Sequence, residues 1–214
     1  MSLIISTVGT SLITNLFTTK RDNQPVLSEM YRPLLNAHAN AWGNIPALHP
    51  VFATVDAHYA AEPAQLANCA EMAPLTLYAQ RMPSQPAPSY LFLATQTTQG
   101  EYCAQKLTQF VANTYRVEAR FLTVPFLHVG DPSHLNAGWN NLRDTLNALH
   151  AIHPNVVYNV TGGYKLISSL VTTYATTHGS RVIYTFDGSG VLTVIDVNVR
   201  GALPHMHVDV EFWR

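Results

Sequence analysis

The sequence predicts an α/β domain built on a mostly parallel sheet that is flanked by helices and ends in an antiparallel hairpin. From residue 89 onward, short apolar runs rich in β-branched residues alternate with longer runs of helical periodicity, which is the pattern of right-handed βαβ crossovers. Two of the strand runs lead through glycine turns directly into helices. Near residues 187–190 a short turn separates two further strand runs, as in a hairpin.

The expected elements are those with clear hydrophobic periodicity. Strands are expected at residues 3–8, 90–94, 117–124, 156–160 and 181–186, and hairpin strands at 191–197 and 207–212. Helices are expected at residues 12–17, 28–42, 101–115, 136–150 and 164–178. A chain of 214 residues fits one domain, in which residues 1–186 form the α/β unit and residues 187–214 form its hairpin extension.

Residues 44–88 carry weaker patterns. We interpret residues 49–54 as a strand, and residues 63–77 as a helix because alanine and leucine are frequent there. Residues 82–88 are expected to form a loop, because their prolines remove backbone donors that a helix or central strand needs. Pro33 would be accommodated best in the first turn of its helix.

The composition excludes several classes of function. A formal net charge of −1 gives no overall basic field, so we expect no long nucleic acid as a partner. Only 12% of the residues are charged, which fits a surface partly covered by a second subunit. The apolar run at residues 3–8 is too short for a signal sequence or a membrane span. Cys69 and Cys103 lack metal or redox spacing, which favours a reduced cytosol. We therefore expect a soluble, cytoplasmic protein that contacts no membrane.

Two glycine turns are the candidate functional features. Gly9-Thr10-Ser11 follows the first strand run, and Thr-Gly-Gly-Tyr-Lys at 161–165 follows the run at 156–160. Such turns direct free N–H groups and the positive end of a helix dipole at an anion. Lys165 is poorly placed for helix stability and well placed to meet a phosphate. Because ligands of doubly wound sheets bind at the carboxyl ends of the strands, we expect the two turns to flank one crevice.

Other patterns do not define a site. His205 and His207 lie on one face of an expected strand, but two histidines without a third ligand are typical of a surface, so we expect no metal and no cofactor. A protein of unrelated Rossmann-like type that binds NAD or a mononucleotide is an alternative. Against it, no Gly-x-Gly-x-x-Gly follows the first strand run, and no acidic residue ends a clear second one.

Three motifs occur in order along the chain. They are Ser-Thr-Val-Gly-Thr-Ser at 6–11, Thr-Gln-Thr-Thr-Gln-Gly-Glu-Tyr-Cys-Ala at 95–104 and Asn-Val-Thr-Gly-Gly-Tyr-Lys at 159–165. Together they resemble the first-strand motif, the Ser-Asp-Thr-x-x-Gly-x-x-Cys-Ala turn and the Asn-x-Thr-Gly-Gly-x-Lys motif of the CRISPR-associated Rossmann-fold (CARF) family. The middle motif departs from the family pattern, because Thr95 and Gln96 replace Ser-Asp. The resemblance extends over roughly residues 1–186.

The resemblance implies a homodimer that binds a cyclic oligoadenylate, the second messenger of type III CRISPR systems, across its two-fold axis. Many CARF proteins carry a helical HEPN ribonuclease domain. We expect none here, because the residues after 186 have strand patterns and the Arg-to-His spacings at 32–38 and 143–150 fall within expected helices. The chain is instead similar to ring nucleases, which switch off CRISPR signalling by cleaving the ring, with cyclic tetra-adenylate as the expected substrate. A non-catalytic sensor or sponge that regulates a partner is the alternative.

Ring cleavage requires no metal in this reaction class, because the ribose 2′-OH can attack the adjacent phosphorus and leave a linear product with a 2′,3′-cyclic phosphate. We expect Lys165 to stabilise charge in the transition state and Ser11 to position the phosphate or the 2′-OH. Ser11 could instead be a helix N-cap. Further ligand contacts are expected from Gly9, Thr10, Gln96, Thr97, Thr161, Gly162, Gly163 and Tyr164.

Overall fold

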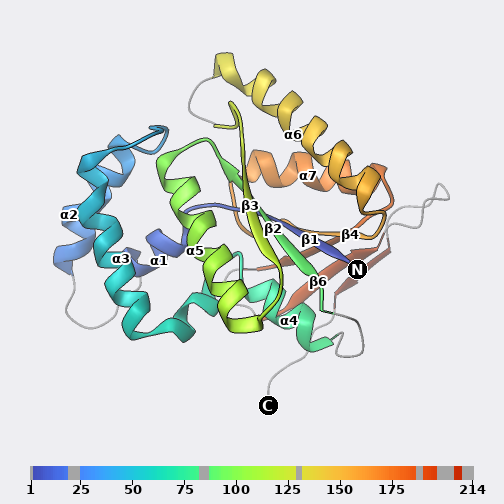
Figure 1. Ribbon diagram of the computed structural model, residues 1–214, viewed down its shortest axis with the longest axis horizontal. Helices are drawn as coiled ribbons and strands as arrows, with labels where there is room; N and C mark the ends of the chain where they lie inside the picture. The colour runs from blue at the N-terminus through green and yellow to red at the C-terminus, as the bar shows by residue number, and fades with distance from the viewer. Residues whose placement is uncertain are drawn as a thin grey trace.

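A seven-stranded sheet forms the centre of the computed structural model, which describes residues 2–18, 25–81, 87–128, 132–186, 190–196 and 205–208 (Figure 1). Its spatial order is β3-β2-β1-β4-β5-β6-β7. The strands are β1 (Leu3–Thr7), β2 (Ser89–Thr95), β3 (Ala119–Val124), β4 (Val156–Asn159), β5 (Arg181–Thr185), β6 (Leu192–Asp196) and β7 (His205–Val208). The first five are parallel, whereas β6 and β7 pair antiparallel. The predicted fold class, a Rossmann-like parallel sheet with an antiparallel edge, is confirmed.

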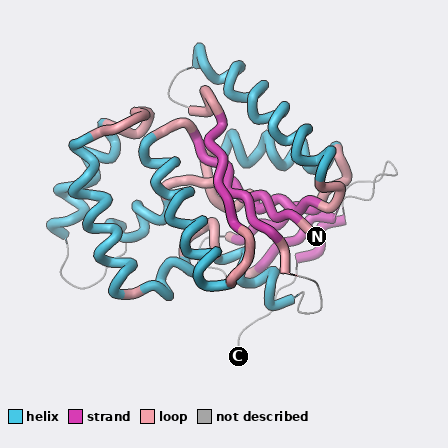
Figure 2. Tube along the Cα trace, viewed as in Figure 1, coloured by secondary structure: helices cyan, strands magenta, loops and turns pink. Residues whose placement is uncertain are grey.

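Helices cover both faces of this sheet (Figures 1 and 2). One face is covered by α1 (Ser11–Thr18), α2 (Pro25–Ala37), η1 (Pro46–Leu48), α3 (His49–Ala61), η2 (Pro63–Asn68), α4 (Ala73–Arg81) and α5 (Thr98–Tyr115). The other face is covered by α6 (Pro132–Ile152) and α7 (Lys165–Thr177). No helix in these described ranges is both long enough and apolar enough to cross a membrane.

Successive side chains of β1 contribute alternately to the two hydrophobic cores, one on each face of the sheet. Ile4 packs with the α1–α5 layer, whereas Leu3 and Ile5 pack with α6 and α7, because successive side chains of a strand point to opposite faces. All residues of β1, β2 and β4 are buried. Central strands of a parallel sheet are covered on both faces, which is why these three read as continuous apolar runs in the sequence.

The prediction of a strand at 49–54 is wrong, because these residues begin helix α3. Val51 and Val55 are fully buried, and their spacing of four residues puts both on one helix face. Pro50 lies in the first turn, where its missing N–H costs nothing. The alanines that follow favour the helix further.

The helix expected at 63–77 is divided in two. A 3₁₀ segment, η2, ends at Asn68, and α4 begins only at Ala73. The backbone of Cys69 is extended, with ψ 157°. This interruption turns residues 69–72 toward the carboxyl ends of β1 and β4, where one of them, Glu71, takes part in the site described below.

Other boundaries also differ from the predictions. Pro33 lies inside α2 and not in its first turn, because that helix already begins at Pro25, whose fixed φ suits a first helical position. Of the expected hairpin turn at 187–190, only Gly190 is described. Residues 82–86 of the expected loop and 209–212 of the last strand also lie outside the described residues.

Truncation of a core leucine tests the packing between α5 and the sheet. Leu107→Ala should lower the free energy of unfolding by about 2–5 kcal/mol, because Leu107 is fully buried and its removal leaves a cavity. Leu166→Ala is the matched control. That side chain is 44% exposed on α7, and its loss should cost about 0.5 kcal/mol or less. Urea unfolding measures both, and equal losses would contradict the packing described.

Candidate functional site: two glycine turns at the switch point of the sheet

The two glycine turns lie side by side at the carboxyl ends of β1 and β4. These strands are parallel neighbours, and Ser6 pairs with Asn159 just before the turns begin. The chain leaves β1 toward β2 and β3 on one side and leaves β4 toward β5 on the other, so the turns mark the point where strand order reverses. Doubly wound sheets bind their ligands at this point.

The backbones of the turns are in direct contact. A Cβ atom built on Gly9 would lie 2.7 Å from the backbone nitrogen of Gly163 and 3.0 Å from its Cα. Only glycine permits that approach. Gly163 itself has φ +95°, a conformation that glycine adopts without strain. The two glycines therefore let two chain segments meet that are far apart in the sequence.

The second turn, residues 161–165, is anchored through one carbonyl. Gly162 O accepts hydrogen bonds from Thr7 Oγ1 at 2.5 Å and from Ser168 Oγ at 3.2 Å. Because the peptide bond is trans, the N–H of Gly163 points away from these two hydroxyls. The N–H groups of residues 162–165 donate to no acceptor in the described part of the chain. Four backbone donors at the start of α7 are thus left without a partner among the described residues.

Lys165 is the first residue of α7, and Tyr164 precedes it as the N-cap, with extended backbone and no side-chain cap. The Lys165 side chain is exposed, and its Nζ forms no ion pair with any residue in the described ranges. Tyr164 is half-buried, and burial raises the pKa of its phenol, which keeps it neutral. The turn therefore combines open N–H donors with one exposed cation.

Glu71, which the sequence analysis did not identify, fills the space beneath both turns. Its side chain is fully buried. Oε1 accepts a hydrogen bond from Gly9 N at 2.8 Å, and Oε2 accepts one from the Ser11 hydroxyl. On the other side, a Cβ built on Gly162 would lie 2.5 Å from Glu71 Cγ. One carboxylate thus contacts residues of both turns.

Asn159 fixes the backbone that carries this carboxylate. Its Nδ2 donates to Glu71 O and to Ser6 Oγ, both at 2.8 Å, while its Oδ1 accepts from Thr161 N at 3.2 Å. Asn159 is fully buried, so these bonds replace water for all of its polar atoms. The asparagine of the 159–165 motif therefore has a structural task, which is to join β1, β4 and the segment that carries Glu71.

Ser11 is held between Glu71 and the neighbouring backbone. Its hydroxyl donates to Glu71 Oε2 and accepts from Ala70 N at 3.2 Å. It does not cap α1, because the first helical carbonyl is that of Thr10, which accepts from Ile13 N and Thr14 N at 2.9 and 2.8 Å. The Ser11 hydroxyl and the Gly9 N–H, both expected to meet a ligand, thus already contact the carboxylate.

The side chains of the other predicted ligand residues are engaged by neighbouring backbone groups. Gln96 Oε1 accepts from Phe126 N at 2.7 Å, which ties the β2 turn to the segment after β3. Thr97 is only 1% exposed, and its hydroxyl caps α5 by accepting from Gly100 N at 3.0 Å. Thr161 Oγ1 accepts from Thr185 N at 3.0 Å. The structure therefore brings together residues 9–11 and 162–165, while Gln96, Thr97 and Thr161 support adjacent segments.

The described residues around Glu71 include no cation paired with it. No lysine or arginine in the described part of the chain forms an ion pair with it. Burial, and then the charge of Glu71, raise the pKa of the Cys69 and Cys103 thiols, so both stay protonated. Burial likewise raises the pKa of Tyr59, which donates to Leu12 O at 2.9 Å. Glu71 is surrounded by neutral groups and is stabilised by hydrogen bonds.

The sequence contains one signal that could have pointed to Glu71. It is the only charged residue between Glu62 and Arg81, within a stretch of small and apolar residues. An isolated charge in such a stretch indicates a buried group with a specific partner. Nothing in the local sequence names that partner.

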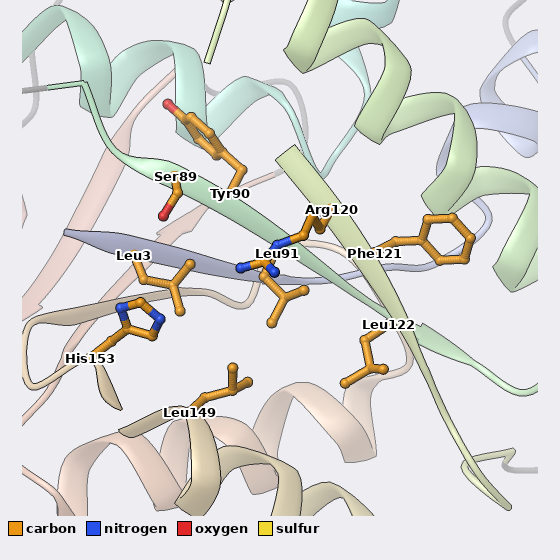
Figure 3. A pocket seen from close by; sticks show the side chains of 9 residues that line it. All are labelled: Leu3, Ser89, Tyr90, Leu91, Arg120, Phe121, Leu122, Leu149 and His153. Carbon is orange, nitrogen blue, oxygen red and sulfur yellow. The ribbon is translucent and has the colours of Figure 1, made fainter. Parts of the chain in front are cut away.

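A separate hollow of about 210 Å³ lies at the opposite, amino ends of β1 and β2 (Figure 3). Figure 3 shows Leu91 and Leu122 on the side of the sheet that faces Leu149 of α6, with His153 just after that helix. None of the glycine-turn residues lines this hollow. It is therefore distinct from the switch-point site.

Fold and site together define a class: an α/β protein whose paired glycine turns form an anion-receptive edge at the switch point of a Rossmann-like sheet. Residues 66–195 match the family model described as CRISPR-associated protein (Cas_APE2256). Because the match covers more than half of the chain, the protein belongs to this CRISPR-associated family. The matched range includes Glu71 and the second turn, whereas the first turn precedes it. The comparison with curated proteins finds no match.

A double-mutant cycle tests the contact between Gly162 and Glu71. Gly162→Ala should cost about 1–3 kcal/mol of stability, because its new methyl group would overlap the Glu71 side chain. In a Glu71→Ala background the overlapping atoms are gone, so the same change should cost clearly less. Urea unfolding of the four proteins gives both costs. Equal costs in the two backgrounds would show that the methyl group added at residue 162 does not meet the Glu71 side chain.

Proposed function

We propose that this protein is a ring nuclease that binds a cyclic oligoadenylate, with cyclic tetra-adenylate as the expected ring, and cleaves it without a metal ion. The observation that carries the proposal is the second turn, where four N–H groups without an acceptor among the described residues and the exposed Lys165 follow β4 at the switch point of the sheet. Membership in a CRISPR-associated family supports a role in CRISPR signalling. The resemblance of the three motifs to CARF proteins supports the nucleotide ligand.

The chemistry needs positioning and charge stabilisation more than it needs a strong external nucleophile. The ribose 2′-oxygen attacks the adjacent phosphorus, the bond from phosphorus to the 5′-oxygen breaks, and the products carry a 2′,3′-cyclic phosphate and a 5′-hydroxyl. Negative charge grows on the phosphoryl oxygens in the transition state. The Lys165 ammonium and the N–H groups of Gly162 and Gly163 are suited to stabilise it, while Ser11 orients the reacting groups.

A homodimer would place two copies of the site around one ring. A two-fold axis presents every contact twice, and a ring of four or six identical nucleotides can have the same symmetry. The second turn of each subunit would then meet the ring phosphates, one from each side of the ring. The low proportion of charged residues, 12%, fits a surface that a second subunit partly covers. Cleavage of the ring would switch off the type III CRISPR response.

A second candidate function is a sensor or sponge that holds the ring without cutting it. One observation favours it: the Gly9 N–H and the Ser11 hydroxyl are both bound to Glu71. The first turn therefore offers fewer free groups to a phosphate than its sequence suggests, and binding could depend mainly on the second turn. The two functions differ in whether the ring is intact after long incubation.

Incubation of the protein with labelled cyclic tetra-adenylate and hexa-adenylate in EDTA tests the proposal. We expect linear products from the wild type. Lys165→Ala should abolish cleavage because the transition-state charge loses its cation, and Ser11→Ala should slow it by ~10–1000-fold, the range for one misplaced catalytic contact. Lys106→Ala is the matched control, because that lysine pairs with Asp56 at 2.8 Å on α5 and should leave the rate unchanged.

The outcomes separate the candidates. A bound ring that stays intact would discard the nuclease and support the sensor. A protein that neither binds nor cleaves either ring would discard both.

A further inference from the structure

We propose that Glu71 is a positioning residue for ring cleavage: it acts through Ser11, whose hydroxyl proton it accepts while Ser11 takes the proton of the attacking 2′-OH. The inference rests on the proposed function and concerns the same site. Neither the family description nor the three sequence motifs assign a role to this residue.

The hydrogen bonds of Ser11 set the direction of its hydroxyl. A serine hydroxyl has one proton to donate and two lone pairs to accept with. The proton is used by Glu71 Oε2, since a carboxylate can only accept, and one lone pair is used by Ala70 N at 3.2 Å. One lone pair remains. An approaching ribose 2′-OH can therefore bond to Ser11 only by donating its proton.

Glu71 and Ser11 differ in burial, and the Ser11 hydroxyl lies closer to the protein surface than the Glu71 carboxylate. Glu71 is fully buried, whereas Ser11 is partly exposed at the start of α1. The carboxylate therefore cannot touch a ligand directly, and Ser11 stands between it and the surface of the turn. Oε1 is held by the Gly9 N–H at 2.8 Å, which fixes the carboxylate with Oε2 toward Ser11. This is the arrangement of a nucleophile activator oriented by a third group.

Two proton transfers accompany the attack of the 2′-oxygen on phosphorus. The 2′-OH proton moves to Ser11 Oγ, the Ser11 proton moves to Glu71 Oε2, and the freed electron pair of the 2′-oxygen forms the new bond to phosphorus. The bond from phosphorus to the 5′-oxygen breaks, and that oxygen takes a proton from water. Glu71 later returns its proton to solvent through Ser11. A serine alone is a poor base, and the carboxylate behind it removes this obstacle.

Among the titratable side chains that surround it, Glu71 is the one suited to accept a proton, because the others stay protonated. The titratable groups around it are the thiols of Cys69 and of Cys103 on α5, and the phenol of Tyr59 on α3. All three have a raised pKa and stay neutral near pH 7. Across the turns, Lys165 of α7 is the exposed cation. A carboxylate has two acceptor oxygens, and here Oε1 accepts from the Gly9 N–H while Oε2 accepts from the Ser11 hydroxyl, so the carboxylate is directly hydrogen-bonded to the serine through which it acts.

Glu71→Gln tests the proposal, because it keeps the size of the side chain and removes its ability to take a proton. In single-turnover assays with cyclic tetra-adenylate and hexa-adenylate, we expect cleavage to slow by ~100-fold or more, the contribution typical of general base catalysis. Ring affinity should stay within about threefold, because the buried Glu71 side chain does not contact the ring.

A double mutant shows whether Glu71 acts through Ser11. If it does, adding Glu71→Gln to Ser11→Ala should cause almost no further loss of rate, since residues that act as a unit are not additive. Glu118→Gln is the matched control. That acid is exposed, pairs with Arg120 at 3.3 Å and lies just before β3, at the far end of the sheet.

Several outcomes would overturn the proposal. A Glu71→Gln variant that cleaves at the wild-type rate would exclude the proton transfer while leaving the nuclease function intact. Parallel losses of rate, affinity and melting temperature would reduce Glu71 to a structural support. A wild-type protein that leaves both rings uncut would remove the proposed function, and with it this role.

Discussion

The carboxylate of Glu71 joins two turns that come from nearly opposite ends of the chain. Through Oε1 it holds the backbone of Gly9, through Oε2 it holds Ser11, and its side chain packs against Gly162. Charge-assisted hydrogen bonds of this kind are roughly twice as strong as neutral ones, and they are strongest where water is excluded. The first turn depends most on this contact, because the second is also anchored by Thr7 and Ser168 through the carbonyl of Gly162.

The interruption between η2 and α4 makes the contact possible. A continuous helix over residues 63–77 would keep its backbone N–H and C=O groups paired within the helix. The break frees them instead, and Asn159 binds the carbonyl of Glu71 while Ser11 accepts from the N–H of Ala70. Local helix propensity is thus overridden by buried polar bonds to the sheet. The 3₁₀ geometry of η2 fits this role, since 3₁₀ segments occur where a helix is interrupted.

The two turns have different tasks although their sequences look alike. In the first turn the Gly9 N–H and the Ser11 hydroxyl are directed inward to Glu71. In the second, the carbonyl of Gly162 is bound by Thr7 and Ser168, and the N–H groups of residues 162–165 have no acceptor among the described residues. One turn is therefore organised by an internal anion, while the other is available to an external one, with Lys165 beside it.

Hydrophobic periodicity in the sequence determined the order of strands and helices from residue 89 onward, and thereby the fold class. It also implied that the two glycine turns would meet, because parallel strands joined by right-handed crossovers end at the same edge of a sheet. Tertiary structure alone decided that the helix at 63–77 is divided and that Glu71 occupies the space beneath the turns. Ser11 and Glu71 are 60 positions apart. Periodicity reports which face of an element is buried, and a polar contact over such a separation exists only once the chain has folded.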